Sequence, residues 1–361
     1  MKVLSVIDSF KGTITSKRLG EITKEELEKQ EIDCDYLAIS DGGEGFLDAI
    51  SNNLKLDENF VEVNDPLYRP IKAKYLTYKK EIAYVELAES SGIGLLKQNE
   101  LNPYIASTYG LGEVIKDAIK KGYKNIIVGI GGSATNDGGS GMLEALGVKF
   151  YKDDKLINHI HNNIFKEITK IDETEFKEFI KDVSFTVTSD VTNPLLGPKG
   201  ATYVFSPQKG AKENDLSVLE SNMDYYGKFK EEYIVRPGSG AAGGVGFAFH
   251  AYFNAKFYPG IDYILDSIDF DSLVKEYDYI FTGEGKVDNQ SFLGKVVFRI
   301  AERAKDNKVI VLCAIKEVDN NIPRNIKGIY SIVNDNVTKD MSMENPEKYF
   351  RLLVSELGKE L

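Results

Sequence analysis

The chain has 361 residues, of which 42% are hydrophobic and 28% are charged, and 45 basic against 56 acidic side chains give a formal net charge of −11. This length predicts two domains rather than one. The acidic balance argues against a nucleic-acid partner or an anionic membrane partner, because both need a basic face. The net charge does not exclude the binding of small anionic ligands, since backbone amides and a few local lysines can bind them.

The cysteines, the histidines and the N-terminus argue against further classes of protein and of enzyme chemistry. Cys34 and Cys313 are far apart in apolar runs, which indicates buried free thiols in a reducing compartment. The N-terminus lacks the apolar length of a signal peptide and no stretch could span a bilayer, so we expect a cytoplasmic protein. His159, His161 and His250 lie outside every glycine-rich motif. Zinc hydrolysis and Ser-His-Asp or Cys-His chemistry therefore have little support.

The apolar pattern of the N-terminal half changes once along the chain. It first predicts two βα units, with strands at 3–7 and 36–39 and helices at 16–30 and 46–54. Residues 60–86 then alternate between polar and apolar, which predicts antiparallel strands with one solvent-facing side. Further strands are predicted at 126–130 and 185–188 and helices at 112–121 and 142–146, while the charged stretch 153–182 is expected at the periphery.

The βα pattern returns near the C-terminus, with strands predicted at 279–281, 309–313 and 329–333 and helices at 292–305 and 346–361. Neither end of the chain can bury a sheet by itself, but together they predict one five-stranded parallel sheet. The expected fold class is therefore α/β with two α/β domains. Residues 1–59 plus 276–361 form a discontinuous, flavodoxin-like parallel-sheet domain, and residues 60–275 form an inserted mixed α/β domain. A ligand cleft is expected between them, at the carboxyl ends of the strands.

One pattern occurs twice, as Asp41-Gly42-Gly43-Glu44-Gly45 and as Asp137-Gly138-Gly139-Ser140-Gly141. Each copy follows an apolar run and opens a predicted helix. Such a turn directs backbone N–H groups and the positive end of the helix dipole at one spot, which favours an anion. The alternative is that the aspartate only caps the helix and the glycines only shape the turn. The repetition favours the binding role.

The segment 130–139 carries the densest signal, because its small polar residues offer many donors with little bulk, as a phosphate or a polyol hydroxyl requires. Its candidate ligand residues are Gly131, Gly132, Ser133, Thr135, Asn136, Asp137 and Gly138. It is not a P-loop, since no Gly-Lys-Ser/Thr ending follows. Gly238–Gly243 formally matches a dinucleotide fingerprint, but residues 231–237 make a poor first strand and Pro259-Gly260 interrupts the unit. We expect Gly240 and Gly243 to form a helix start that faces an anion, or to allow close packing.

Cations and carboxylates complete the candidate site. Lys11 follows the first strand within Asp8-Ser9-Phe10-Lys11 and can neutralise a phosphate or carboxylate, unless Asp8 and Ser9 merely shape the turn. Lys209 and Lys295 add further cations. Asp190, just beyond the strand 185–188 and before Asn193-Pro194, is the candidate base for an acceptor hydroxyl, with Asp8, Asp41 or Asp137 as alternatives. Glu284 and Asp288 lie in one predicted turn after 279–281 and could hold Mg²⁺, or form a charged surface turn.

These features predict a small-molecule kinase or a phosphate-ester enzyme, because phosphoryl transfer needs phosphate positioning, Mg²⁺ and a carboxylate near the acceptor. The motifs also occur in the order found in one family. The chain resembles the bacterial type-1 glycerate kinases in the segments 8–12, 40–45, 131–139, 190–195, 207–211, 240–244 and 282–285.

The resemblance implies ATP-dependent phosphorylation of D-glycerate with Mg²⁺, commonly to 2-phosphoglycerate, in the cytoplasm. It also implies a two-domain α/β fold with the active site in the interdomain cleft, and it leaves a homodimer open. Two alternatives remain: a kinase for another small sugar acid or polyol, and a non-catalytic sensor of an acidic metabolite.

Overall fold

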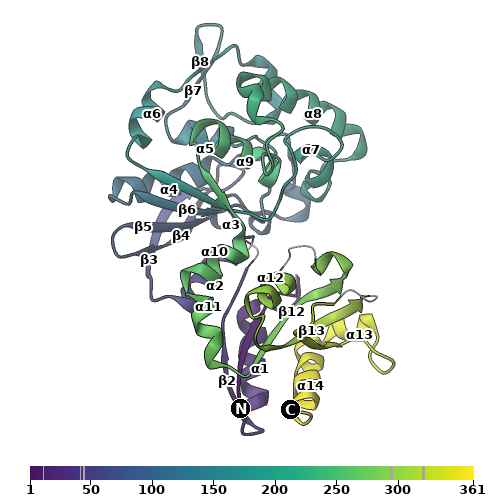
Figure 1. Cartoon of the computed structure of the whole chain (residues 1–361). Helices are drawn as coiled ribbons and strands as arrows, with labels where there is room; N and C mark the ends of the chain where they lie inside the picture. Colours follow the sequence, from purple (N-terminus) through teal and green to yellow (C-terminus); the bar gives the residue numbers. More distant parts are fainter. Residues whose placement is uncertain (11, 41, 44, 293–295, 319–321) are drawn as a thin grey trace. The chain divides into compact units, whose positions relative to one another are not determined.

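The computed structural model describes the chain except residues 11, 41, 44, 293–295 and 319–321 (Figure 1). The chain forms two compact units. Unit 1 contains Met1–Asp41, Asp48–Lys55 and Gly260–Leu361, and unit 2 contains Gly42–Leu47 and Leu56–Pro259. The helix α2 (Phe46–Asn53) therefore begins in unit 2 and ends in unit 1.

Unit 1 is built on a five-stranded sheet in the order β14-β13-β12-β1-β2. All four pairings are parallel, which confirms the expected parallel sheet assembled from both ends of the chain. The strands are β1 (Lys2–Ile7), β2 (Asp33–Tyr36), β12 (Tyr279–Asp288), β13 (Lys308–Glu317) and β14 (Ile326–Ser331). The second strand ends earlier than predicted. Ala38 and Ile39 are buried in the loop that follows it, where the Ile39 amide donates to Ser16 Oγ.

The helices of unit 1 are α1 (Ser16–Glu28), most of α2, α10 (Gly260–Ser267), α11 (Phe270–Leu273), α12 (Val296–Arg303), α13 (Lys339–Glu344) and α14 (Pro346–Gly358). Short 3₁₀ turns are η6 (Val274–Glu276) and η7 (Asn289–Phe292). α1 begins at Ser16 because the Thr15 side chain accepts from the Arg18 amide. The apolar faces of α1 and α14 contribute Leu19, Ile22, Phe350 and Val354 to one buried core with β1.

Unit 2 contains a six-stranded mixed sheet in the order β11-β10-β6-β5-β4-β3. Its strands are β3 (Asp57–Asn64), β4 (Pro70–Tyr78), β5 (Ile82–Glu86), β6 (Asn125–Gly129), β10 (Ser184–Thr188) and β11 (Lys256–Tyr258). The strands β3, β4 and β5 pair antiparallel, as the alternation of residues 60–86 predicts. From β5 to β11 every pairing is parallel.

The helices of unit 2 are α3 (Ala88–Ser91), α4 (Tyr109–Lys120), α5 (Ser140–Ala145), α6 (Thr174–Ile180), α7 (Ala201–Phe205), α8 (Glu213–Gly227) and α9 (Ala241–Tyr252). The 3₁₀ turns are η1 (Ile93–Leu95), η2 (Gln98–Glu100), η3 (Asn162–Glu167), η4 (Pro207–Lys209) and η5 (Lys228–Tyr233). The turn η5 precedes the Gly238–Gly243 match at the position where a dinucleotide fold would need a strand.

The charged stretch 153–182 is only partly peripheral, contrary to expectation. It belongs in part to a small antiparallel sheet, β8-β7-β9, made of β7 (Lys149–Lys152), β8 (Lys155–Ile157) and β9 (Lys170–Asp172). Its apolar residues Ile160, Phe165, Ile168 and Phe176 are fully buried in the core of unit 2. In the sequence, the charged residues between these apolar residues hide the pattern that would predict their burial.

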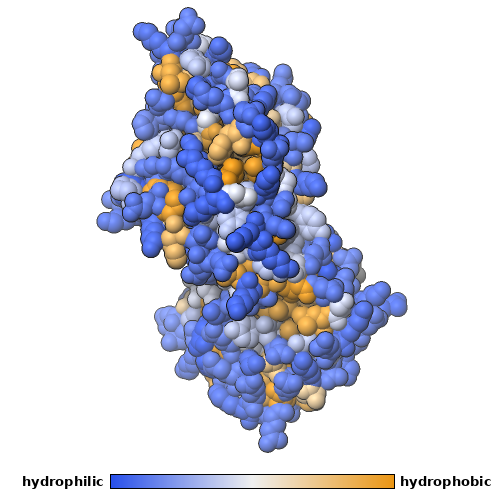
Figure 2. Space-filling model, turned by 90° about the vertical axis from the view of Figure 1, so that its left-hand side faces the viewer, coloured by the Kyte–Doolittle hydropathy of each residue, from blue (hydrophilic) through white to orange (hydrophobic). Residues whose placement is uncertain are grey.

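The face drawn in Figure 2 is mostly hydrophilic, and its apolar residues gather in separate patches. Among the described residues, no helix has the length and apolar character needed to cross a membrane.

Candidate active site

Four polar or glycine-rich segments of unit 2, far apart in the sequence, meet through hydrogen bonds. The Gly138 amide donates to the Gly243 carbonyl at 2.9 Å, and the Gly240 amide donates to the Asn193 carbonyl at 2.8 Å. Lys209 Nζ donates to Ser133 Oγ and to the Thr135 carbonyl, both at 2.6 Å. The structure thus gathers the segments 131–139, 190–197, 207–211 and 238–244 into one cluster, which we call the loop cluster.

Close backbone packing explains two of its glycines. At Gly243 φ is +68°, and a Cβ atom there would lie inside contact distance of the Thr135 carbonyl oxygen. A Cβ atom at Gly240 would meet the Pro194 carbonyl oxygen in the same way. The three consecutive residues Ala242, Gly243 and Gly244 all have positive φ at the start of α9. Strained backbone of this kind persists where the surrounding structure over-determines it, often at functional sites.

Asp137, in the second copy of the repeated motif, acts as a helix cap. Its side chain is fully buried, and its carboxylate accepts from the Thr108 amide (2.8 Å), Thr108 Oγ1 (2.7 Å), the Gly139 amide (3.1 Å) and the Gly141 amide (3.2 Å). Burial raises the pKa of this carboxyl, and the four hydrogen bonds act in the opposite direction. The residue ties the start of α4 to the start of α5, so its oxygens are engaged with the protein.

Glu86 plays the matching part for the first copy. This glutamate ends β5, is 5% exposed, and accepts from the Gly45 amide at 2.8 Å and from the Leu47 amide at 2.9 Å. A protein carboxylate therefore already occupies the amide groups at the start of α2. Sequence reasoning missed Glu86; the available signal was a single acid that ends the apolar run Ile82–Val85.

The remaining predicted residues of unit 2 differ in exposure. Asp190 is exposed two residues beyond β10, while Asn193 is half-buried and donates from Nδ2 to the Lys199 carbonyl at 2.8 Å. Gly131 and Gly132 are half-buried after β6, and the Gly132 carbonyl accepts from the Ile93 amide at 2.8 Å. Gly42 is buried and Gly43 half-buried. Asn136 is fully buried, with its Nδ2 at 3.4 Å from Thr202 Oγ1.

Lys209 is the lysine of the loop cluster, and it is buried, at 2% exposure. Burial lowers the pKa of its ammonium group to about 7, and the charge of Asp137 acts against that shift. The lysine therefore lies behind the glycine-rich segment and holds it from within the unit.

In unit 1, Asp8 and Glu284 lie at neighbouring strand positions. Ile7 is the partner of Gly283 in the parallel pair β1–β12, and the Asp8 amide donates to the Gly283 carbonyl at 2.9 Å. Asp8 is 5% exposed, and its Oδ1 accepts from the Ser9 amide at 2.7 Å. The backbones of these two acidic residues are thus adjacent at the carboxyl end of β1, the end at which ligands of parallel sheets bind.

Asp288 is separated from Glu284 by the strand itself. The expected turn after residue 281 is instead a continuation of β12, which pairs with β13 as far as Asp288 and Glu317. Residues four apart on an extended strand lie about 13 Å from each other. The structure therefore does not bring Glu284 and Asp288 together on one ion. Among the described residues there is also no group of three or more His, Cys, Asp or Glu side chains placed to hold a metal.

Three predicted site residues, Lys11, Asp41 and Lys295, lie outside the described residues.

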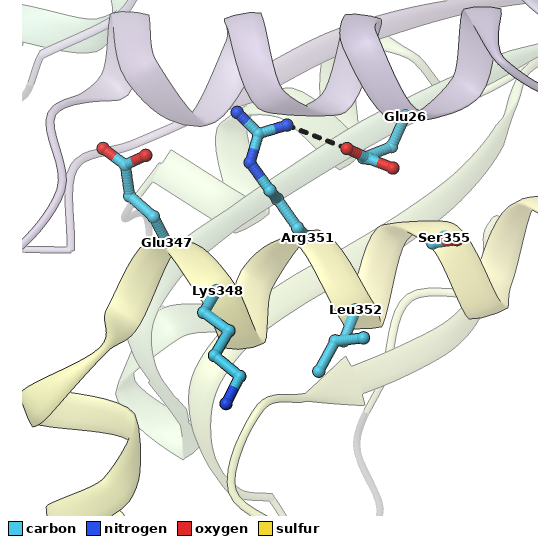
Figure 3. Close-up of a pocket in the computed structure, with 6 residues that line it drawn as sticks. All are labelled: Glu26, Glu347, Lys348, Arg351, Leu352 and Ser355. Atoms are coloured by element: carbon cyan, nitrogen blue, oxygen red, sulfur yellow. Dashed lines mark hydrogen bonds and ion pairs between the residues drawn. The ribbon is translucent and has the colours of Figure 1, made fainter.

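A surface pocket of unit 1, of about 540 Å³, contains none of the predicted residues. It is lined by Glu26, Glu347, Lys348, Arg351, Leu352 and Ser355 (Figure 3). Arg351 reaches from α14 to Glu26 on α1 at 2.8 Å, while Lys348 and Leu352 point away from α1. The ion pairs across this pocket join two helices, and we assign it a structural role.

Comparison with known proteins agrees with this set of motifs. A model of the glycerate kinase family matches residues 3–361. The chain is 33% identical over 372 residues to the glycerate kinase of Bacillus subtilis (strain 168), which covers 99% of this chain and 97% of that protein. It is 33% identical over 313 residues to the glycerate 2-kinase of Escherichia coli (strain K12), which covers 84% of this chain and 82% of that one.

A solved structure agrees over the same length. The crystal structure of a protein from Salmonella typhimurium LT2, described as a glycerate kinase 2, superimposes with a TM-score of 0.82 at 28% identity, covering 100% of this chain and 98% of that chain. The match spans both α/β units and every segment of the loop cluster. The chain therefore belongs to the glycerate kinase family, whose named relatives are phosphotransferases with an alcohol group as acceptor.

Proposed function

We propose that this protein transfers the γ-phosphoryl group of ATP to D-glycerate, with Mg²⁺ as the assisting ion and 2-phosphoglycerate as the product. The observation that carries the proposal is the family match over residues 3–361. The loop cluster supports it, because it gathers four segments whose small polar residues are of the kind that a phosphorylated or polyhydroxyl ligand needs as donors. Phosphoryl transfer asks the protein mainly for such positioning and for charge stabilisation.

We assign the acceptor base to Asp190. A base has to reach the hydroxyl that it deprotonates, and Asp190 is exposed beside the rigid Asn193-Pro194 turn. Asp137 suits this role less well, because its carboxylate is fully buried and accepts four hydrogen bonds from the protein.

We assign Mg²⁺ to Glu284 with Asp8, and no longer to the pair Glu284 and Asp288. The donor set fits, because Mg²⁺ takes one or two carboxylates and completes its shell with phosphate oxygens and water. When bound, the ion would neutralise charge on the phosphoryl group being transferred. Asp8, just beyond the end of β1, and Glu284, within the neighbouring β12, would hold the ion from adjacent backbone positions.

An assay of ADP release with D-glycerate, glycerol and other small sugar acids tests the substrate. We expect turnover with D-glycerate and Mg²⁺, loss of turnover with EDTA, and little turnover with glycerol, which lacks the carboxylate. Phosphorus NMR of the product tests the position: a phosphate on carbon 2 couples to one proton, whereas a phosphate on carbon 3 couples to two. Equal turnover of glycerol would remove glycerate as the substrate.

The base is tested by Asp190→Asn, with the exposed Asp182→Asn as a matched control. We expect kcat to fall by roughly a hundredfold in the first variant, the usual scale for a positioned base, and to stay unchanged in the second. Nucleotide binding and thermal unfolding should be retained in both. Normal turnover of Asp190→Asn, together with an inactive Asp8→Asn, would move the base to unit 1.

A further inference from the structure

Lys209 is a buried cation without a counterion. It is 2% exposed at the end of η4, and the two acceptors of its ammonium, Ser133 Oγ and the Thr135 carbonyl, are both neutral. Within the described part of the chain no carboxylate lies at ion-pair distance from it, and Asp137 acts on it only through space. A buried charge that lacks an opposite charge is costly, and a neutral donor would hold the same two acceptors more cheaply.

The surroundings of Lys209 are polar and incompletely bonded. Thr135 Oγ1, Asn136 Oδ1 and Ser206 Oγ are buried and have no hydrogen-bond partner among the described residues. Native proteins rarely leave buried polar atoms in this state, and an absent ligand or ordered water is a usual reason. Thr135 and Ser206 contact Lys209 directly, because its amine binds the Thr135 carbonyl and its amide donates to the Ser206 carbonyl at 3.0 Å, and Asn136 follows Thr135 in the chain.

Ser133 links the cation to the outer side of the loop cluster. Its Oγ accepts from Lys209, so its own hydroxyl hydrogen is left for another acceptor. A hydroxyl that is polarised by a cation is a stronger donor, and an anion is the acceptor that gains most from it. Ser133 is 6% exposed and Lys209 is 2% exposed, so Ser133 is the more accessible of the two residues.

We propose that Lys209 is a positioning residue for a ligand whose anionic group accepts a hydrogen bond from the Ser133 hydroxyl. The negative charge of that group complements the charge of Lys209, and binding of the ligand makes the Lys209 amine take up a proton. The proposal rests on the proposed kinase function, which supplies two such groups: the carboxylate of glycerate and the phosphates of the nucleotide.

The expected proton uptake follows from the direction in which burial shifts the pKa of Lys209. Burial lowers the pKa of Lys209 to about 7, so at pH 8 only about one-tenth of the free enzyme carries the charge. A bound anion favours the charged form, and binding at pH 8 then draws a proton from the buffer. At pH 6 the lysine is already charged, and binding should take up much less. Asp137 is the described charged group that acts on the amine, and its charge favours the protonated form of Lys209.

Isothermal titration calorimetry of the full-length protein tests this. D-glycerate and ADP are titrated separately at pH 6 and pH 8, in two buffers of different ionisation enthalpy. We expect roughly half a proton or more to be taken up at pH 8 with one of the two ligands, and little at pH 6; the ligand that shows uptake is the one seated on the loop cluster. Lys209→Met should abolish the uptake, whereas the exposed Lys228→Met should keep it.

Ser133→Ala is the second variant, and it leaves the lysine in place. We expect it to weaken binding of the same ligand about tenfold and to reduce the uptake, and circular dichroism confirms that each variant is folded. Wild-type binding at pH 8 without proton uptake, or an unchanged uptake in Lys209→Met, would overturn the proposal. An active wild-type enzyme without uptake contradicts only this inference, whereas an enzyme inactive on D-glycerate contradicts the proposed function.

Discussion

Asp137 illustrates how one buried carboxylate can account for a motif that looks like a ligand site. The same aspartate that suggests an anion cradle in the sequence instead satisfies three backbone amides and one hydroxyl of its own unit. Charged hydrogen bonds of this kind are stronger than neutral ones, and they cannot be surrendered to a ligand without loss of stability. Of the glycines around it, Gly141 faces Ser107 and Thr108, and Gly139 faces Ala248, so close packing accounts for both.

Asp137→Asn should therefore act on stability. The amide nitrogen of asparagine would face donors that need an acceptor, and we expect the free energy of unfolding to fall by about 2–4 kcal/mol. Urea denaturation measures this, with the exposed Asp154→Asn as a control that should change it by less than about 0.5 kcal/mol. A variant that unfolds like the wild type but has lost turnover would assign Asp137 to ligand or catalysis instead.

Gly243 is a second residue whose type is dictated by its neighbours. Gly243→Ala adds a Cβ atom against the Thr135 carbonyl as well as imposing positive φ on alanine, and we expect a loss of about 3 kcal/mol or more. Gly122→Ala is the matched control, because Gly122 also has positive φ but nothing within 4 Å of the added atom. It should lose only about 1 kcal/mol. Similar losses in the two variants would show that backbone strain, and not the close approach, determines the cost.

At the scale of elements, α2 and α5 begin in the same way but are capped from different places. α5 is capped by Asp137 from its own motif, whereas α2 is capped by Glu86 from β5. Phe46 also packs against Gly129 at the end of β6 and lies near Tyr84, with ring centroids 6.4 Å apart. The short segment Gly42–Leu47 is thus held to unit 2 by a carboxylate and by one aromatic side chain.

Glu86→Gln tests this cap. Glutamine retains only one acceptor oxygen, so one of the amides of Gly45 and Leu47 loses its partner. We expect the amides at the start of α2 to exchange with deuterium about tenfold faster, which corresponds to about 1.4 kcal/mol. Glu81→Gln, an exposed residue just before the same strand, should leave the exchange of α2 unchanged. Unchanged exchange in Glu86→Gln would mean that the packing of Phe46 alone holds the helix.

At the scale of the whole molecule, charges at the surface of unit 1 link the two ends of the chain. Arg18 on α1 binds Glu347 on α14 at 2.9 Å, and Arg351 on α14 binds Glu25 on α1 at 2.6 Å. The hydrogen bonds from Arg18 and Arg351 lower the pKa values of Glu347 and Glu25 below the ordinary value of 4.5. A carboxyl whose pKa is lowered by folding stabilises the folded state above that ordinary value, and this contribution is lost as the pH falls below it.

Arg351→Gln should accordingly lower the melting temperature at pH 7 by a few degrees at most, because these pairs are partly exposed. The difference from the wild type should shrink as the pH falls from about 5 to about 3 and in high salt. Lys348→Gln, on the same helix but without an ion pair in the described chain, serves as the control. A difference that persists at low pH would mean that Arg351 acts through packing.

Features of this protein that depend on local sequence pattern could be predicted, whereas features that depend on contacts between distant segments could not. The strands of unit 1 and the antiparallel strands β3 and β4 follow from local apolar periodicity, and the joint parallel sheet follows because neither end of the chain can bury a sheet alone. The packing of Phe165 and Phe176 was hidden by the charged residues around them. The separation of Glu284 from Asp288 depends on pairing with β13, and the capping role of Glu86 depends on a contact with a distant turn; neither could be derived from local pattern.

The repeated passage of the chain between the two units has a consequence for the order in which they can be completed. The ribosome has made every strand of unit 2 once Tyr258 is in place. At that moment β1 and β2 are the strands of unit 1 that have been synthesised. The neighbouring strand β12 and the two strands beyond it, β13 and β14, are complete only when Ser331 has been added. The first strand to be synthesised is thus among the last to be paired on both sides. Because unpaired strand edges invite association with other chains, the nascent protein is most vulnerable at its oldest segment, after its middle has already become able to fold.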